Sequence, residues 1–224
     1  MALHPPLWSS RHQAGLELAE RLRFSMGDGA DCTVLALPRG GVPVAVAVAE
    51  RLHLPLATWS VRKVADPRWP ELAIGALAGG GVAVWRNGQA AGQRELLAHQ
   101  QGWFQAQEKE LVRRQRLFGD PAAAALRGRH LIVVDDGIAT GMTVKAALLS
   151  LRQVQPRRLT LAVPVVDRTV AQDLEGLVDQ LEALAIVNHL EAVGMWYETF
   201  NQLSDREVQE LLAPWLRHRD RACP

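Results

Sequence analysis

Two hydrophobic patterns alternate along the chain. Short runs of apolar, β-prone residues predict buried strands at 33–37, 56–61, 130–134, 158–166 and 184–187. Longer segments with apolar residues at helical spacing predict helices at 11–26, 42–52, 94–118, 142–154, 169–178 and 205–216. A strand, a helix and a second strand in this order form a βαβ unit, which requires parallel strands. The pattern therefore predicts an α/β domain whose central, mostly parallel sheet is flanked by helices.

Polar residues mark the start of two predicted helices. Ser9 or Ser10 is placed to cap the first helix, and Ser204 with Glu207 forms a capping-box pattern at the start of the last. The first helix is expected to face the core through five apolar side chains, which are Leu16, Leu18, Ala19, Leu22 and Phe24.

Residues 64–88 interrupt the alternation. Pro67, Trp69 and Pro70 break regular structure, and the glycines at 79–81 form a turn between two segments, 72–78 and 82–85, that fit a β-hairpin. We interpret this part as an excursion from the main sheet. The chain shows no internal repeat or low-complexity tract, so residues 1–224 are predicted to form a single domain.

Composition and charge argue against several classes of function. The 224 residues include 25 basic and 24 acidic side chains, and the net charge of +1 gives no overall attraction to nucleic acid or to an anionic membrane. The longest clean apolar run, 42–49, ends at Glu50 and Arg51 and is too short to span a bilayer. Cys32 and Cys223 form no zinc-binding pattern, and the N-terminus lacks the features of a signal peptide. We therefore expect a cytoplasmic protein in which a local site does any anion binding.

The most informative motif spans residues 131–143. Four apolar residues predict a buried strand, two adjacent acids follow at its carboxyl end, and a loop with Thr140 and Gly141 leads into a helix. Ligands of open α/β sheets bind beyond the carboxyl ends of the strands, and a helix N-terminus offers N–H groups and a positive dipole end to a phosphate. Carboxylates beside a phosphate site suit the hydroxyls of a ribose, directly or through hydrated Mg²⁺. The motif therefore fits a ribose 5-phosphate.

A structural role would also explain part of this motif. An Asp-Asp pair at the end of a strand can begin a turn and cap the next helix. The full order of strand, acids, threonines, glycine and helix is more specific than the pair alone. It lacks both the Gly-Lys-Ser/Thr ending of a Walker loop and the spaced glycines of a dinucleotide site. We therefore favour the ribose-phosphate interpretation.

Residues 135–143, Asp-Asp-Gly-Ile-Ala-Thr-Gly-Met-Thr, resemble the phosphoribosyl-pyrophosphate signature of the type I phosphoribosyltransferases. The resemblance covers residues 10–213 and includes Pro-Arg-Gly-Gly at 38–41, Arg-Lys at 62–63 and Val-Gly-Met-Trp-Tyr-Glu at 193–198. The whole pattern is similar to the bacterial members of the family whose base is unassigned. Only the Asp-Asp signature is highly specific to the chemistry.

The resemblance implies a role for each segment. Asp135 and Asp136 would orient the ribose and, with Glu198, hold Mg²⁺, while Lys63 would join the two acids as a catalytic residue. The implied substrate-binding residues are Arg39, Gly40, Gly41, Asp135, Asp136, Ala139, Thr140, Gly141, Met142, Thr143 and Trp196. A lid or flap at about 64–88, with Glu71 as a weak extra candidate, would close over the site, and a hood at about 188–216 would cover the base.

The supporting segments also have ordinary structural interpretations. Residues 38–41 fit a strand-to-helix turn, and the basic pair at 62–63 fits an exposed strand end. Trp196 and Tyr197 fit a packing contact for the last helix. The family often has a non-proline cis peptide in its pyrophosphate loop, and the sequence leaves this point open.

The resemblance implies a Mg²⁺-dependent transfer of ribose 5-phosphate from phosphoribosyl pyrophosphate to a nitrogenous base, with release of pyrophosphate. Ala139 stands where enzymes for 6-oxopurines usually carry an Asp that handles the base proton, so a different base is favoured and its identity is open. The main alternative is a regulatory protein that senses phosphoribosyl pyrophosphate or a nucleotide, and hydrolysis or phosphotransfer on a ribose phosphate is a third. Relatives are often dimers, so a homodimer is one of the assemblies left open.

Overall fold

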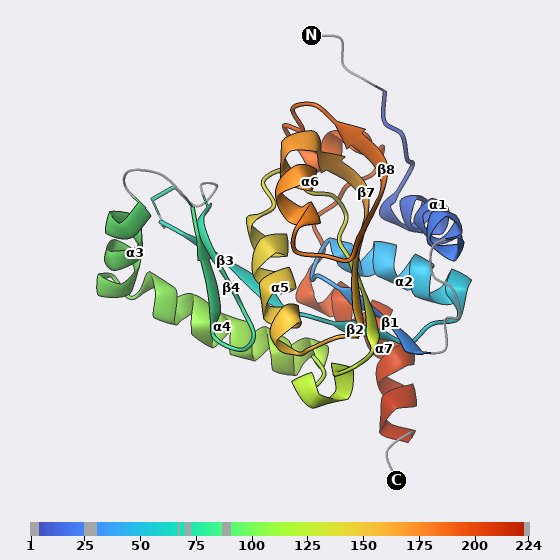
Figure 1. Ribbon diagram of the computed structural model, residues 1–224, viewed down its shortest axis with the longest axis horizontal. Helices are drawn as coiled ribbons and strands as arrows, with labels where there is room; N and C mark the ends of the chain where they lie inside the picture. Colours follow the sequence, from blue (N-terminus) through green and yellow to red (C-terminus); the bar gives the residue numbers. More distant parts are fainter. Residues whose placement is uncertain (1–4, 25–30, 67, 70–72, 87–90, 222–224) are drawn as a thin grey trace.

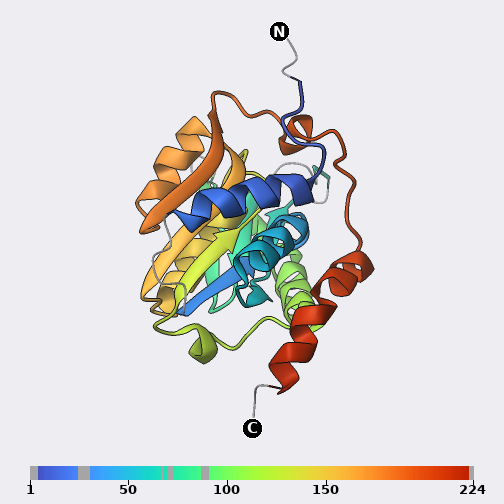
Figure 2. The same cartoon turned by 90° about the vertical axis from the view of Figure 1, so that its right-hand side faces the viewer.

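The computed structural model describes residues 5–24, 31–66, 68–69, 73–86 and 91–221 (Figures 1 and 2). The helices are α1 (Arg11–Arg23), α2 (Gly41–Leu52), α3 (Ala91–Gln100), α4 (Trp103–Phe118), α5 (Met142–Gln153), α6 (Arg168–Glu175) and α7 (Asp205–Arg221), with 3-10 turns η2 (Ala123–Leu126) and η3 (Val193–Trp196). The strands are β1 (Cys32–Ala36), β2 (Leu56–Thr58), β3 (Val61–Ala65), β4 (Ala73–Ala78), β5 (Val82–Trp85), β6 (His130–Val134), β7 (Arg158–Asp167) and β8 (Gln180–Val187). No helix in these ranges combines the length and apolar character needed to cross a membrane.

A parallel sheet in the order β2-β1-β6-β7-β8 forms the centre of the fold. In Figure 1 the sheet is seen nearly edge-on, with α5 and α6 on one side and α1 and α2 on the other. One apolar cluster fills the space under α5 and α6, and a second fills the space under α1, α2 and α7. The α/β fold with a central parallel sheet is therefore confirmed.

The strand order reverses between β1 and β6. From β1 the chain passes through α2 to β2 on one side, and from β6 it passes through α5 to β7 on the other. The two central strands stay paired to their ends, where the Leu37 N–H donates to the Val134 carbonyl at 2.9 Å. A reversal of this kind leaves a crevice beyond the carboxyl ends of the strands. The loops after β1 and β6 therefore lie side by side.

A second sheet holds the excursion predicted at 64–88. The predicted hairpin is confirmed as β4 and β5, and β3 adds a third antiparallel strand. This small sheet lies between α5 on one face and α3 and α4 on the other (Figure 1). The described part of this excursion therefore forms a packed layer of the fold.

The strand predicted at 56–61 is wrong, because it is two strands in different sheets. Asp120 fixes the break between them: its carboxylate accepts hydrogen bonds from the Thr58 hydroxyl at 2.7 Å, the Ser60 N–H at 2.6 Å and the Ser60 hydroxyl at 3.0 Å. These bonds replace strand pairing at the point where the chain leaves the main sheet.

Two helix predictions also need correction. The helix predicted at 94–118 is α3 followed by α4, because Gly102 adopts a left-handed conformation with φ of 73°. Ser10 caps α1 as one of the two candidates predicted, but Leu16 and Phe24 are exposed. The buried side of α1 instead includes Ala14 and Gly15, because small residues let the helix approach α2 closely.

We predict that Gly15→Ala destabilises the fold. An added Cβ would lie 2.5 Å from the Val44 carbonyl oxygen and 2.7 Å from the Ala47 Cβ, so α1 and α2 must move apart. Overpacking of this kind lowers the free energy of unfolding by ~1–3 kcal/mol, measurable by urea denaturation. Gly92→Ala in α3 is the matched control, because nothing lies within 4 Å of its added Cβ, and it should be neutral or stabilising. Equal effects of the two variants would contradict the close packing of α1 on α2.

Candidate functional site

Two acids follow β6 at the carboxyl edge of the sheet. Asp135 and Asp136 are partly buried, and the Asp136 N–H donates to the Asp135 Oδ1 at 2.9 Å. Burial raises the pKa of the Asp135 carboxyl well above its usual value, and the neighbouring charge of Asp136 raises it further. Burial also raises the pKa of Asp136, while the positive charge of Arg11 opposes this rise. The pair therefore favours a ligand that brings positive charge or hydrogen-bond donors.

Arg11 lies against this pair, although sequence reasoning gave it no role. Its Nε donates to Asp136 Oδ2 at 2.8 Å, and the two side chains are 11% and 13% exposed. The same guanidinium donates to the Asn201 carbonyl at 3.0 Å and stacks 3.6 Å from the centre of the Phe200 ring. Arg11 starts α1, where a positive charge opposes the helix dipole, and this is the only signal in the sequence that could have marked it.

The loop at 38–41 touches the acids directly. A Cβ on Gly40 would lie 2.1 Å from Asp136 Oδ2, and a Cβ on Gly41 would lie 2.6 Å from the Val134 carbonyl oxygen. Only glycine allows the backbone to come this close. The Pro38–Arg39 peptide bond is cis. No side chain caps α2 at Gly40, and the N–H groups of Gly41 and Val42 donate to the Leu37 and Arg39 carbonyls at 3.1 and 3.2 Å.

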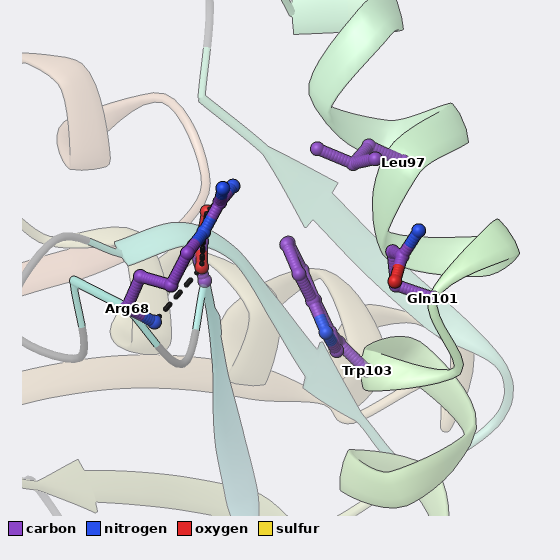
Figure 3. Close-up of a pocket in the computed structure, with 5 residues that line it drawn as sticks. Arg68, Leu97, Gln101 and Trp103 are labelled. Atoms are coloured by element: carbon purple, nitrogen blue, oxygen red, sulfur yellow. Dashed lines mark hydrogen bonds and ion pairs between the residues drawn. The ribbon is translucent and has the colours of Figure 1, made fainter.

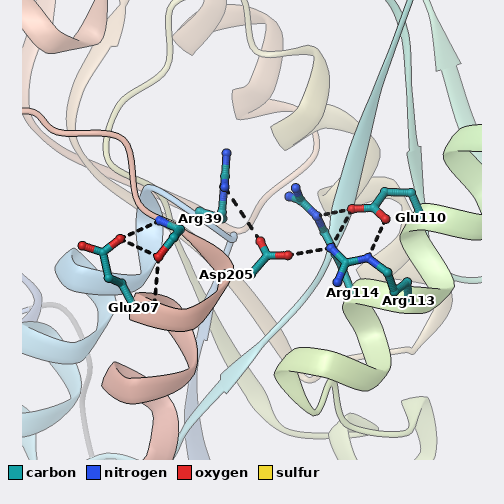
Figure 4. Close-up of polar contacts among 7 residues, drawn as sticks. Arg39, Glu110, Arg113, Arg114, Asp205 and Glu207 are labelled. Atoms are coloured by element: carbon teal, nitrogen blue, oxygen red, sulfur yellow. Dashed lines mark hydrogen bonds and ion pairs between the residues drawn. The ribbon is translucent and has the colours of Figure 1, made fainter.

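Arg39 belongs to a chain of ion pairs that joins three segments (Figure 4). Its Nη1 lies 3.8 Å from Asp205 Oδ1 at the start of α7, and Asp205 Oδ2 accepts from Arg113 of α4 at 2.6 Å. Glu110 accepts from Arg113 at 2.6 Å and from Arg114 at 3.0 Å. These hydrogen bonds, that from Arg113 first, lower the pKa of Glu110 to about 2. The loop at 38–41 is therefore tied to α4 and α7 by charge.

The predicted basic pair at 62–63 divides between two faces of the small sheet. Arg62 donates to Gln107 of α4 at 3.0 and 2.8 Å. Burial lowers the pKa of Arg62, and the nearby charges of Arg114 and Arg39 also contribute. Side chains alternate along a strand, so Lys63 lies on the opposite face, which packs against α5. Arg62 thus lies near Arg39 and Arg114 on the face toward α4, whereas Lys63 lies on the face toward α5.

The loop before α5 forms a cup. Ile138 fixes the loop to β7, because its N–H donates to the Val165 carbonyl and its carbonyl accepts from the Asp167 N–H, both at 2.9 Å. Gly141 has φ of 72°, and a Cβ there would lie 2.4 Å from Val170 Cγ1. No side chain caps α5, so its first N–H groups are left for a ligand, with Thr140 exposed beside them. This geometry suits a phosphate.

The segment around Trp196 is bound to the N-terminal segment. The Trp196 carbonyl accepts from the N–H groups of Leu7 and Trp8 at 3.1 and 3.2 Å. The Tyr197 ring is buried between Trp8 and Phe200, with ring centres 5.5 and 5.2 Å away. Trp196 and Tyr197 therefore pack near the start of the chain, and the interpretation that they pack against the last helix is wrong. Trp196 is half-buried against the same apolar cluster.

Tyr197 also reaches the acid pair. Its hydroxyl donates to the backbone carbonyl of Asp136 at 2.5 Å, and burial raises its pKa. Because its ring and hydroxyl are both engaged, Tyr197 supports the site and is not free to stack on a base. Gly137 lets the loop after β6 approach Val193 closely, because a Cβ there would lie 2.6 Å from Val193 Cγ1.

The predicted metal ligands are only partly brought together. Across the described residues there is no group of three or more His, Cys, Asp or Glu side chains that could hold a metal ion, so exposed Glu198 does not join Asp135 and Asp136 in one. Glu71 lies outside the described residues. Two carboxylates nevertheless fit Mg²⁺, which takes one or two protein carboxylates and fills its other positions with water and substrate phosphate oxygens.

A cavity of about 330 Å³ lies elsewhere, between the end of β3 and helices α3 and α4 (Figure 3). Its lining residues are Asp66, Arg68, Leu97, Gln101 and Trp103. Arg68 donates to Asp66 at 2.6 Å, and this hydrogen bond lowers the pKa of Asp66. None of the predicted site residues that the structure describes lines this cavity, so it is separate from the loops that follow β1 and β6.

Comparison with known proteins agrees with this geometry. The model of the phosphoribosyl transferase domain family matches residues 9–182. A Mycobacterium tuberculosis protein with the provisional name phosphoribosyl transferase is 39% identical over 215 residues, which are 96% of this chain and 48% of that protein. The chain thus spans about half the length of the curated relatives it matches. The crystal structure of TT1426 from Thermus thermophilus is 34% identical, covers 93% of this chain and 98% of its own, and gives a TM-score of 0.70.

We predict opposite effects on stability for the two acids. Asp135→Asn keeps the acceptor for the Asp136 N–H and removes a partly buried charge, so it should stabilise the fold by ~0.5–2 kcal/mol. Asp136→Asn leaves Arg11 without its carboxylate and should destabilise by ~1–3 kcal/mol. Urea denaturation measures both differences.

The gain from Asp135→Asn should depend on pH. The raised pKa means that the folded state binds this proton more tightly than the unfolded state. The neutral acid therefore contributes stability below the unfolded pKa of about 4, and this contribution is lost as the pH rises through the folded pKa. Asn stays neutral, so the gain should grow from pH 4 to pH 8. A gain that is constant with pH would show that Asp135 is not held in an environment that disfavours its charge.

Proposed function

The chain belongs to the phosphoribosyl transferase domain family, and from this premise we propose that it is a Mg²⁺-dependent phosphoribosyltransferase acting on phosphoribosyl pyrophosphate and a nitrogenous base. One observation carries the proposal. The acid pair lies beside two helix starts that no side chain caps, at the point where the strand order reverses. A ribose with phosphate at one end and pyrophosphate at the other has charges and hydroxyls that match this arrangement.

Each part of the site supports a defined task. The N-terminus of α5 with Thr140 and Thr143 would bind the 5-phosphate, and Asp135 and Asp136 would accept hydrogen bonds from the ribose hydroxyls. Arg39 and the loop at 38–41 would bind the pyrophosphate, with Lys63 approaching from the small sheet. Mg²⁺ held by the carboxylate oxygens would supply neutralising charge for the pyrophosphate.

The reaction would be a displacement at the anomeric carbon. The bond from this carbon to the pyrophosphate oxygen breaks as the bond to a base nitrogen forms on the opposite face. Orientation of the ribose and stabilisation of the departing pyrophosphate supply the catalysis, and no covalent intermediate with the protein is needed. Ala139 packs against the apolar cluster of the hood and cannot take a proton from the base, so the proposed acceptor is a base that needs no acid at this position.

We predict that phosphoribosyl pyrophosphate with Mg²⁺ stabilises the protein against heat. At ~100 times its dissociation constant the ligand adds about 2.7 kcal/mol, which for a chain of this size raises Tm by roughly 5–10 °C. The shift should need Mg²⁺ and should vanish in the double variant Asp135→Asn, Asp136→Asn. No shift in the wild type at millimolar ligand would mean that the crevice has a different ligand.

We predict that Arg39→Met weakens the binding of phosphoribosyl pyrophosphate by 10–100-fold, because a charge-assisted hydrogen bond is worth ~1.5–3 kcal/mol. Arg206→Met is the control, because Arg206 is an exposed residue of α7 that pairs only with Glu210 on its own helix among the described residues.

Pyrophosphate release should require an added base, which a panel of bases would identify. If phosphoribosyl pyrophosphate binds but no base in the panel causes release of pyrophosphate, the result favours a sensing protein over an enzyme.

A further inference from the structure

Arg11 provides the positive charge that balances the acid pair. Two carboxylates on adjacent residues repel each other, and partial burial strengthens the repulsion. Of the ion pairs among the described residues, the one between Arg11 and Asp136 is the only one that either acid makes. The low exposure of its arginine distinguishes it from the ion pair of Arg21 with Glu182 on the same helix, where the Arg21 side chain is 54% exposed and that of Arg11 is 11% exposed.

The position of Arg11 is set by the hood. Its guanidinium is held by the Asn201 carbonyl and the Phe200 ring, at 3.0 Å and 3.6 Å. The Phe200 ring in turn stacks on Tyr197, whose hydroxyl donates to the Asp136 carbonyl. The hood therefore acts on Asp136 in two ways. It holds Arg11, which bonds the Asp136 side chain, and its Tyr197 bonds the Asp136 backbone.

The ion pair also sets the direction of the Asp136 carboxylate. Oδ2 receives Arg11 and lies so close to Gly40 that a Cβ there would be at 2.1 Å. A rotation of the carboxylate would break the bond to Arg11 while the backbone stays held by Tyr197. The bond to Arg11 therefore favours the orientation in which Asp136 Oδ2 faces Arg11 and Gly40.

We propose that Arg11 is a positioning residue for the ribose. It holds Asp136 in the orientation that accepts the ribose hydroxyls, and it links this orientation to the hood. The inference rests on the proposed function, since it assigns the ribose to the acid pair. Arg11 acts through Asp136 and has no contact with the loop at 38–41 among the hydrogen bonds and ion pairs described, so its effect should be confined to ligands that contain the sugar.

The test compares three ligands by calorimetric titration of the full chain. They are phosphoribosyl pyrophosphate with Mg²⁺, ribose 5-phosphate without Mg²⁺, and pyrophosphate without Mg²⁺, so that the last ligand does not depend on a metal ion held by the acid pair. Arg11→Met should weaken the two sugar ligands at least tenfold and change pyrophosphate binding by less than threefold. Arg11→Lys keeps the charge but not the planar guanidinium, so it should recover part of the loss. Arg21→Met, which removes the ion pair of an exposed arginine on the same helix, should bind all three ligands as the wild type does.

The outcomes separate this inference from the proposed function. If the wild type binds none of the sugar ligands, the proposed function fails and the inference fails with it. If the wild type binds them and Arg11→Met binds them equally well, the function stands and the role of Arg11 is refuted. Equal loss of all three ligands would also refute it, because that result indicates general damage to the fold. If Arg11→Met does not fold, Arg11→Lys carries the same comparison of sugar ligands with pyrophosphate.

Discussion

The close contact between the loop after β1 and the acids after β6 is the constraint on which the site depends. Gly40 and Gly41 have no side chain, and a Cβ on either would meet Asp136 or the end of β6 at 2.1 and 2.6 Å. This approach places the loop at 38–41 and a pair of carboxylates side by side at the edge of the sheet, where the strand order reverses. The helices that follow, α2 and α5, then point their N-termini at the same region, which is the arrangement that favours an anion.

The acid pair concentrates negative charge at this contact, and positively charged side chains elsewhere in the molecule compensate for it. Arg11 neutralises one acid, and residues 197–201 hold Arg11 and the backbone of Asp136 in place. On the other side of the loop, Arg39 is tied through Asp205 to the arginines of α4. The candidate site is therefore bordered by two charge networks, one behind the acids and one behind the loop at 38–41. The terminal segments take part in both, α1 in the first and α7 in the second.

The sequence predicts the parts of this arrangement that depend on local pattern. The apolar run at 130–134, the two acids and the glycine before α5 are adjacent in the chain, and they form the strand, the site edge and the helix start that their order predicts. Two features that the sequence did not predict depend on distant partners. Asp120 ends β2 from a position about sixty residues away, and Arg11 reaches Asp136 across 125 positions. Neither pairing leaves a periodic signal, and a single left-handed glycine, Gly102, is enough to divide a helix whose apolar spacing continues through it.

The most direct measurement is a crystal structure of the protein with ribose 5-phosphate and Mg²⁺. The phosphate should lie at the N-terminus of α5, within hydrogen-bonding distance of the N–H groups at 139–143, and the sugar hydroxyls should contact Asp135 or Asp136. A phosphate bound elsewhere, such as beside Arg68 in the cavity near Trp103, with no ligand at the acid pair, would contradict the account.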